Sequence, residues 1–223
     1  MIETGVLFDD IHSFRDLNLV LAPFVLPPAK PKTDYIDVPG RDGSIDATEA
    51  TGKVTYKDRE FSFTFTVFPE DTLTFEERQT VVSNALNGKR CKITLDKDPD
   101  YYLEGRCTVE KHFANKKLRQ IVVGVRCAPY KMKKDETVVS FTVEIGGKQK
   151  TIILQNYCKK QVCPTITLSS PVNIIFGEYK VSYSAGTHKD LNICLLEGEN
   201  TITFYTYGAN APTVTISYRE GDL

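Results

Sequence analysis

The sequence predicts a mainly β protein: an α+β domain with one helix and an extended arm over residues 1–132, followed by a β-sandwich domain over residues 135–223. Three observations predict this class. Several segments alternate apolar and polar residues with the period of two that is typical of half-buried strands. One segment has helical periodicity between helix-capping residues. After residue 136, short apolar runs recur at the regular spacing expected of a sandwich.

The strands of the first domain are predicted from period-two alternation. The clearest example is the phenylalanine-rich run at 61–68, which places an aromatic face toward a core. Residues 96–100, Asp-Lys-Asp-Pro-Asp, combine short acidic side chains with a proline and predict a hairpin loop. The predicted strands are 61–68, 92–95, 102–109 and 120–125.

A helix is predicted from Phe75 to about Leu86. Thr74, followed three residues later by Glu77, has the spacing of a capping box. Asn87-Gly88 follows the last apolar residue and predicts a left-handed stop. The apolar stripe of this helix consists of Phe75, Val81, Val82, Ala85 and Leu86.

Two stretches between these elements predict an extended arm. Residues 23–31 contain four of the eleven prolines, and a proline lacks the backbone donor that a central strand needs. The segment Val38-Pro39-Gly40-Arg41-Asp42-Gly43-Ser44 is rich in turn residues. We therefore expect an arm or a sheet edge here, and not an interior strand.

The sandwich begins after a change of pattern at residues 127–136, where charge replaces apolar periodicity and predicts a domain boundary. Gly146-Gly147 has the chemistry of a hairpin turn between the first two strands that follow. The segments expected as strands are 138–145, 150–155, 165–168, 173–176, 179–183, 190–194, 201–207 and 213–218.

Composition excludes several classes of protein. The chain of 223 residues has 28 Lys and Arg against 29 Asp and Glu, so it lacks the basic excess that marks nucleic-acid or anionic-membrane binding. Its uncharged apolar runs are far shorter than the ~20 residues that span a bilayer. Residues 1–4 provide no basic segment ahead of an apolar one, so we expect no signal peptide and synthesis in a reducing cytoplasm.

The six cysteines are spread widely, and in a reducing compartment the default expectation is free thiols. Cys158 and Cys163 are the one local pair, and a local disulfide between them is the alternative. The same pair is a weak zinc half-site, because no second Cys or His pair stands nearby. The cysteines are Cys91, Cys107, Cys127, Cys158, Cys163 and Cys194.

No pattern of catalytic residues is recognisable. The sequence has no nucleophile elbow, phosphate-binding loop or zinc-protease motif, and His12, His112 and His188 are far apart along the chain. Asp42 and Asp46 are explained by the needs of a turn. We therefore expect no enzymatic activity, no metal and no cofactor.

Tyr205 and Tyr207 support a different hypothesis. They alternate with Thr206 on a predicted strand, so both point to one side of it and can form a glycan-binding face. The alternative, which period two already accounts for, is that they pack in or around the sandwich core.

The order of the unusual segments resembles that of the distal tail proteins (Dit) of long-tailed, non-contractile phages. The resemblance begins with Phe8-Asp9-Asp10-Ile11-His12-Ser13-Phe14 and Leu17 to Leu21, and continues through the proline-rich stretch into Val-Pro-Gly-Arg-Asp-Gly at 38–43. Further matches are Tyr56-Lys57-Asp58-Arg59, Leu86-Asn87-Gly88, Asp98 to Tyr102 with Gly105, Pro129-Tyr130, and Leu196 to Ile202.

This resemblance implies a structural role in the virion. Distal tail proteins have a β-rich first domain and a galectin-like sandwich, and six copies form a ring at the tail tip. The ring joins the tail tube to a tail-associated lysin or baseplate hub protein, and the sandwiches support receptor-binding proteins. The resemblance thus implies a hexamer, protein partners and synthesis in a bacterial host; a carbohydrate-binding module is the alternative.

A ring requires heterologous contacts that close on themselves, and an arm that crosses to the neighbouring copy is an economical way to form them. Prolines pre-extend such an arm and reduce the entropy lost on docking. The near-neutral chain also suits side-by-side assembly of copies. The candidate interface residues are Pro27, Pro28, Pro31, Pro39, Gly40, Arg41, Asp42 and Gly43.

Overall fold

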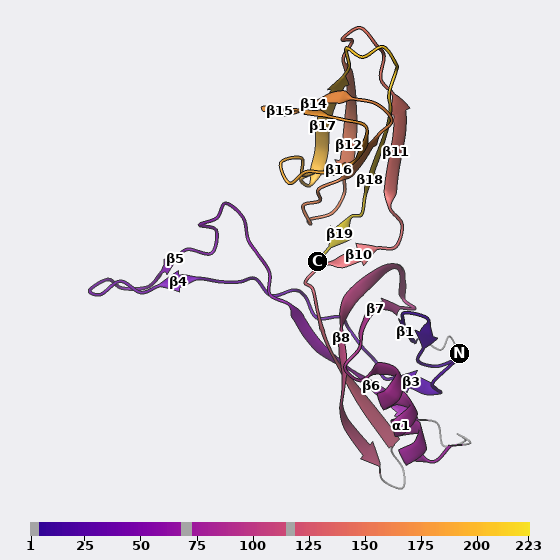
Figure 1. Ribbon diagram of the computed structural model, residues 1–223. Helices are drawn as coiled ribbons and strands as arrows, with labels where there is room; N and C mark the ends of the chain where they lie inside the picture. Colours follow the sequence, from indigo (N-terminus) through magenta and orange to yellow (C-terminus); the bar gives the residue numbers. More distant parts are fainter. Residues whose placement is uncertain (1–4, 68–72, 115–118) are drawn as a thin grey trace. The chain divides into compact units, whose positions relative to one another are not determined.

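The computed structural model describes the backbone of residues 5–67, 73–114 and 119–223 (Figure 1). It divides into two compact units, one of Met1–Lys131 with Leu223 and one of Met132–Asp222. Within the described residues, every regular element except one helix is a strand. The mainly β class predicted from the sequence is confirmed.

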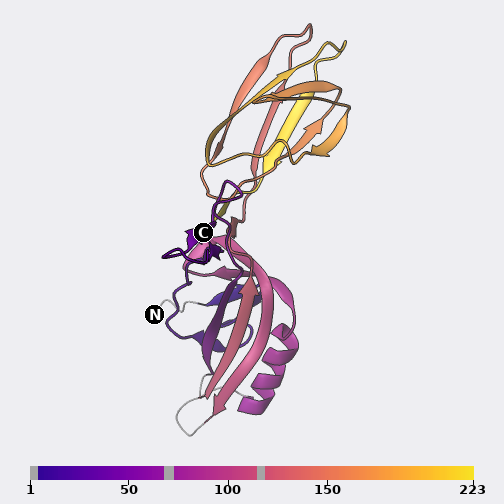
Figure 2. The same ribbon diagram turned by 90° about the vertical axis from the view of Figure 1, so that its left-hand side faces the viewer.

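The first unit is built on one antiparallel sheet with the strand order β2-β1-β7-β8-β9-β6-β3. Its helix α1 (Phe75–Leu86) lies beside the long strand β8, as Figures 1 and 2 both show. The strands are β1 (Val6–Phe8), β2 (Ile11–His12), β3 (Leu19–Leu21), β6 (Arg59–Val67), β7 (Arg90–Leu95), β8 (Asp98–Ala114) and β9 (Arg119–Cys127).

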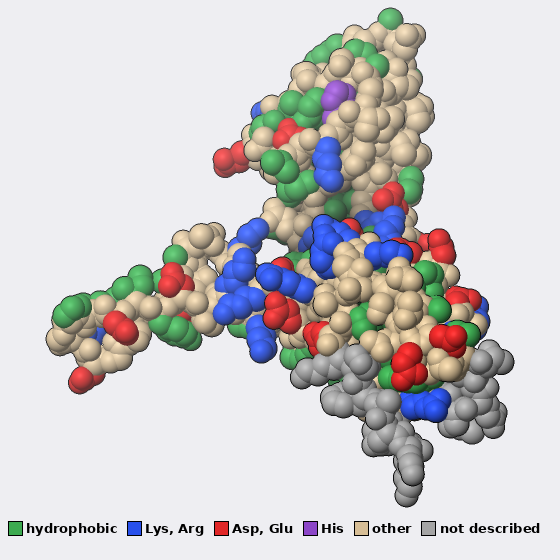
Figure 3. Space-filling view, turned by 60° about the horizontal axis from the view of Figure 1, so that its bottom comes forward, with side chains coloured by type: hydrophobic (Ala, Val, Ile, Leu, Met, Phe, Trp, Pro, Cys, Tyr) green, Lys and Arg blue, Asp and Glu red, His purple; other side chains and the backbone are tan. Residues whose placement is uncertain are grey.

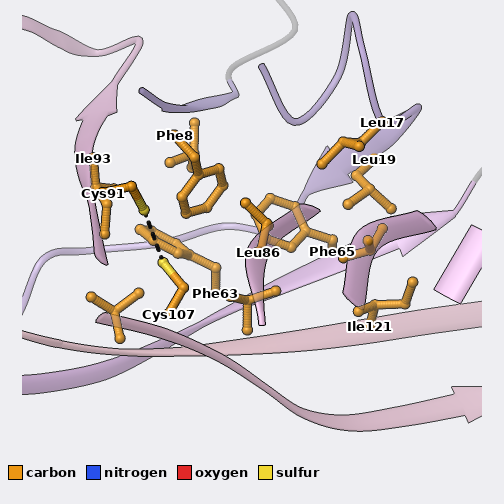
Figure 4. Close-up of a cluster of buried hydrophobic side chains, with 14 of the residues drawn as sticks. Phe8, Leu17, Leu19, Phe63, Phe65, Leu86, Cys91, Ile93, Cys107 and Ile121 are labelled. Atoms are coloured by element: carbon orange, nitrogen blue, oxygen red, sulfur yellow. Dashed lines mark hydrogen bonds between the residues drawn. The ribbon is translucent and has the colours of Figure 1, made fainter. Parts of the chain in front are cut away.

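The core of this unit gathers around the aromatic face predicted for β6. Phe63 and Phe65 are fully buried, and their rings lie edge-on to that of Phe8, with centroids 6.0 and 6.4 Å apart (Figure 4). Leu86 of α1 and Ile121 of β9 join the same cluster. Each such side chain contributes roughly 1.5–3 kcal/mol on burial, so the period-two pattern of β6 largely specifies this core.

The predicted helix cap is present in full. The Thr74 hydroxyl accepts a hydrogen bond from the Glu77 amide at 3.3 Å, and the Glu77 carboxylate accepts one from the Thr74 amide at 2.8 Å. That second bond lowers the pKa of Glu77. Gly88, with φ of 74°, provides the left-handed stop. Val81 is 38% exposed, so it does not belong to the buried stripe as predicted.

The hairpin between β7 and β8 is tighter than the predicted loop at 96–100. β8 already begins at Asp98, and only two residues separate the strands. Pro99 is tolerated in β8 because the ladder shifts register between the pair Leu95–Asp98 and the pair Ile93–Leu103. A proline at such an irregularity costs no ladder hydrogen bond.

The arm (residues 27–58) leaves this unit between β3 and β6. It contains the short antiparallel strands β4 (Tyr35–Ile36) and β5 (Ile45–Asp46). Figure 1 shows this hairpin extending away from the sheet.

The second unit is a sandwich of two four-stranded antiparallel sheets, in the orders β11-β18-β13-β16 and β12-β17-β14-β15. The core between them includes Ile166, Ile174, Ile202, Phe204 and Ile216, each at most 2% exposed. The strands are β11 (Thr137–Thr142), β12 (Lys150–Asn156), β13 (Thr165–Leu168), β14 (Val172–Phe176), β15 (Tyr179–Tyr183), β16 (Gly186–Lys189), β17 (Gly198–Tyr205) and β18 (Thr213–Tyr218). The short strands β10 (Lys131–Lys133) and β19 (Gly221–Asp222) pair with each other.

Two local predictions for the sandwich are wrong. Gly146-Gly147 does not close a hairpin, because β11 pairs with β18 and β12 pairs with β17, in the other sheet. The predicted strand at 190–194 is irregular, and the strand lies at β16 instead. Asp190 is the reason: its carboxylate accepts hydrogen bonds from the Tyr179 and Tyr183 hydroxyls and from the Asn192 amide, which turns the chain there.

The cysteine expectation is wrong for one pair, since Cys163 and Cys194 form a disulfide. Val162 and Leu195 exchange both backbone hydrogen bonds, at 3.1 and 2.7 Å. The next pair of an antiparallel ladder is the close, non-hydrogen-bonded one, and this brings the two Cα atoms to 4.1 Å. Cys158, the partner considered for Cys163 from the sequence, is a buried free thiol.

The other three thiols are also buried. The Cys91 and Cys107 sulfurs lie 3.4 Å apart in the core, and this hydrogen bond together with burial raises the pKa of Cys107 (Figure 4). Burial raises the pKa of the Cys127 thiol to about 11. Thiolate is the reactive form, so the raised pKa values make the Cys107 and Cys127 thiols less reactive, whereas the hydrogen bond with Cys107 lowers the pKa of Cys91.

The disulfide predicts which cysteines react after air oxidation and denaturation. The four thiols of Cys91, Cys107, Cys127 and Cys158 are expected to react with a thiol reagent, and peptide mapping is expected to link Cys163 to Cys194.

Replacing both bridged cysteines with serine is expected to lower the free energy of unfolding of the sandwich by roughly 3–4 kcal/mol, because the denatured chain is then no longer constrained by the loop between them. Cys158→Ala is the control that keeps the link. A mapped bridge from Cys158 to Cys163 contradicts the assignment.

Candidate functional site

The described residues contain no group of three or more side chains arranged to hold a metal ion. His12 has structural partners: its Nε2 lies 3.0 Å from Asp96, and its Nδ1 accepts the amide of Phe14 at 3.1 Å. His188 stacks on Tyr183 with ring centroids 4.5 Å apart. The side chain of His112 lies outside the described residues. In the part of the chain that the structure describes, no helix is long and apolar enough to cross a membrane.

The arm is the most unusual surface of the first unit. Its cross-strand pair Ile36 and Ile45 is 50% and 41% exposed, and Tyr35 is 60% exposed. An isolated two-stranded hairpin is marginally stable in water, and exposed large apolar side chains cluster on surfaces that bind other proteins. The arm is therefore a candidate interface.

A buried arginine fixes the root of the arm. Arg59 is 4% exposed; its Nε donates to the Pro129 carbonyl and its Nη1 to the Pro27 carbonyl, both at 2.6 Å. Pro27 is where the arm starts, Arg59 follows its end, and Pro129 follows β9. One guanidinium thus ties the arm to the sheet at a defined place.

Backbone hydrogen bonds continue this root outward. The Lys57 amide donates to the Lys30 carbonyl and the Lys32 amide to the Thr55 carbonyl, both at 2.8 Å. Around the bridge between Pro31 and Tyr56, these bonds hold the two legs of the arm together. The rings of Tyr56 and Tyr130 meet edge-on, 6.1 Å apart. The legs therefore leave the unit as one ribbon.

The arm residues predicted from the sequence fall into two groups. Pro27, Pro28 and Pro31 lie at the root, where Pro27 accepts a bond from Arg59. The others lie in the exposed turn between β4 and β5: Pro39, Gly40, Arg41, Asp42 and Gly43. Gly40 and Gly43 have φ of 81° and 73°, the left-handed region that favours glycine.

Sequence reasoning missed Arg59 and the Ile36–Ile45 pair. The sequence around Arg59 does not indicate which carbonyls it binds, because both partners are far away along the chain. The isoleucines did carry a signal, since they flank the predicted turn on both sides, but only the structure places them opposite each other.

Tyr205 and Tyr207, the other candidate site, lie together on the outer side of the second sheet. Tyr207 is 77% exposed, and its ring centroid is 5.7 Å from that of Tyr205, at 81°. The Tyr207 ring packs against Gly147, where a Cβ atom would come within 2.4 Å of the ring. Only glycine therefore leaves room for the ring in this position. Asn173 lies opposite Tyr205, and Ser182 lies opposite Asn173. An amide and a hydroxyl therefore border the aromatic pair.

The first unit is thus a β sheet with an exposed, rooted arm, joined in one chain to a β-sandwich. Residues 12–145 match the family described as phage tail protein RIFT-related domain. The match spans more than half of the chain, so this chain belongs to that family of phage tail proteins, which are components of the virion. The resemblance to distal tail proteins drawn from the sequence is confirmed.

Among solved structures, the chain is similar to SPP1 Dit (gp 19.1), described as a paradigm of the hub adsorption apparatus in phages that infect Gram-positive bacteria. The two share 14% identity with a TM-score of 0.68, over 99% of each chain. A designed double-stranded β-helix aligns with 38% of this chain and 99% of its own, at 15% identity and a TM-score of 0.28. No curated protein matches the chain.

Because Arg59 ties the arm to the sheet, we expect its substitution to lower the stability of the first unit strongly. Arg59→Ala is expected to lower the free energy of unfolding of the first unit by about 2–4 kcal/mol, because two half-buried carbonyls lose a charged donor. Arg59→Lys is expected to lose nearly as much, since one ammonium does not reproduce the fork of a guanidinium. Urea denaturation measures both.

Arg126→Ala is the matched control. Arg126 is a second arginine of this sheet, but its side chain is 67% exposed and paired with Asp58 at the surface, so its loss is expected to change stability by less than about 1 kcal/mol. Equal effects at Arg59 and Arg126 would contradict the role assigned to Arg59.

Proposed function

We propose that this protein is a ring-forming subunit at the tip of a phage tail. Copies of the first unit form a hexameric ring that joins the tail tube to a tail-associated lysin or baseplate hub protein. The sandwiches support host-adhesion proteins. The subunit acts by assembly and not by catalysis.

The observation that carries this proposal is the exposed apolar arm in a chain of the phage tail family. Ile36 and Ile45 form one apolar face of the hairpin, and both remain in contact with solvent. Burial of apolar area contributes roughly 25 cal/mol per Å², so docking this face on another chain stabilises both the contact and the hairpin. A contact between unlike surfaces of identical copies repeats, and closes into a ring when the rotation between copies allows it.

Isoleucine replacement in the arm tests the ring. In Ile36→Asp/Ile45→Asp, two carboxylates occupy the apolar face, and we expect at least a tenfold weaker self-association with an unchanged unfolding curve. Native mass spectrometry and negative-stain imaging, with and without the cognate tail-tube and hub proteins, measure the oligomer. Ile153→Asp, at an isoleucine of the sandwich that is 61% exposed, is the control that keeps rings. A wild-type protein that stays monomeric even with its partners would overturn the proposal.

A carbohydrate-binding sandwich is the second candidate function. It is supported by the exposed ring of Tyr207, by the adjoining Tyr205, and by the amide and hydroxyl of Asn173 and Ser182 on the same face. Sugar rings stack on aromatic faces and take hydrogen bonds from neutral polar groups. On this face the Ser182 hydroxyl donates to Asn173 and the Asn173 amide to the Tyr205 carbonyl, so the second N–H of the amide and the lone pairs of the hydroxyl are what a sugar would use.

Glycan arrays and purified cell-wall polysaccharide test the second candidate. Tyr207→Ala is expected to weaken binding by about 2–10-fold, the range that corresponds to the loss of one aromatic stacking contact. Tyr157→Ala is the matched control, since Tyr157 is a tyrosine of the same unit that is 74% exposed and lies outside the face. Absence of binding by the wild-type protein would remove this candidate and leave the ring proposal intact.

A further inference from the structure

The arm separates its charges along its length. Its tip (residues 33–51) has five carboxylates, those of Asp34, Asp37, Asp42, Asp46 and Glu49, against one cationic side chain, Arg41. The two legs at its base have the opposite character, with Lys30 and Lys32 on one and Lys53 and Lys57 on the other. Figure 3 shows Lys and Arg side chains gathered where the arm begins, and Asp and Glu side chains farther out along it.

The lysines at the base line a groove. We name it the basic groove; its walls include Pro27, Pro28, Lys30, Lys32, Lys57 and Arg126. Asp58 and Glu60 also border it, but both lie beside Arg126, at 3.2 and 3.5 Å. Lys30, Lys32 and Lys57 are exposed, and among the residues that the structure describes none of them has a carboxylate partner. The groove therefore presents excess positive charge to a partner.

The tip presents the matching negative charge. Asp34, Asp42 and Glu49 are exposed, with no ion-pair partner within the described part of the chain. Asp46 accepts hydrogen bonds from Thr48, which lower the pKa of Asp46. The tip therefore has an excess of acidic side chains.

Most of the tip lies away from the groove of its own copy. The bridge between Pro31 and Tyr56 and the pair Ile36–Ile45 belong to the same ribbon, so they hold tip and groove apart. Lys32 and Asp37 are five residues apart; extended chain of that length spans about 16 Å, which exceeds the Debye length of about 8–10 Å at physiological salt. Asp34 lies nearer, two residues from Lys32, so it is the carboxylates from Asp37 outward that complement the groove of another copy and not their own.

We propose that the basic groove binds the acidic arm tip of a neighbouring copy. This inference rests on the proposed ring and adds the docking surface and its chemistry. Every copy has one tip and one groove, so the contact is heterologous and repeats around a ring. The charges set orientation and register, as complementary potentials do at interfaces, while the Ile36–Ile45 face supplies apolar burial.

Charge reversal in the full chain tests the contact. The groove variant carries Lys30→Glu, Lys32→Glu and Lys57→Glu; the tip variant carries Asp34→Lys, Asp42→Lys and Glu49→Lys. Each alone is expected to self-associate at least tenfold more weakly than the wild type, because tip and groove then have the same sign. An equimolar mixture of the two is expected to regain association, because each tip meets a groove of opposite charge in the other variant.

The mixture also controls for folding, since two misfolded variants do not rescue each other. Lys180→Glu/Lys189→Glu, at exposed lysines of the sandwich, is the matched control and is expected to assemble as the wild type does. Association of the wild type is expected to weaken as salt rises from 50 to 500 mM, roughly the range over which exposed charges become screened.

Carbodiimide cross-linking identifies the partners directly, because it joins a carboxylate to an amine only in contact. A mixture of natural-abundance and nitrogen-15 protein separates links between copies from links within one. We expect mixed-isotope links from residues 33–51 to Lys30, Lys32 or Lys57. Rings without these links, or rings unaffected by both variants, would overturn this inference and leave the proposed ring standing. A wild type that never associates, with or without its tail partners, would overturn both.

Discussion

The double hydrogen bond from Arg59 to Pro27 and Pro129 is the constraint on which the rest of the first unit depends. It joins three chain segments that meet at one point: the start of the arm, the start of β6 and the chain after β9. Because β6 holds the aromatic core and β9 is its neighbour in the sheet, the direction of the arm is coupled to the packing of that core. An arm rooted in this way presents its tip to a partner with less loss of entropy than a free linker.

The near-neutral net charge of the chain hides an uneven distribution of charge along the arm. A net charge of -1 describes the chain as a whole, yet the arm tip is acidic and the groove beside its root is basic. Such an arrangement avoids repulsion between copies at long range and still favours one relative orientation at short range. Neutrality with internal separation of charge would suit the self-assembly proposed above.

The elements that the sequence predicted well depend on neighbours close in the chain. The α1 cap involves residues three apart, and the alternation in β6 needs only its own residues, so both could be recognised locally. Two of the errors, those at Cys163 and at Gly146-Gly147, involve partners that are distant in sequence. Cys163 meets Cys194 through a ladder that no local pattern reveals, and Gly146-Gly147 has hairpin chemistry although the strands on either side pair elsewhere. The candidate arm was found from its prolines, but Arg59 depends on carbonyls 32 and 70 residues away.

Neither core includes a residue of the arm. In the proposed ring, docking of Ile36 and Ile45 would therefore stabilise the contact and the hairpin without involving either core. A short hairpin with open edges also invites pairing with unrelated strands, and charged side chains are the usual protection against it. Asp34, Asp37 and Asp46 flank or occupy β4 and β5, where they disfavour such pairing. In the proposed ring the same carboxylates would both disfavour such unrelated pairing and favour the lysine-lined groove of the neighbouring copy.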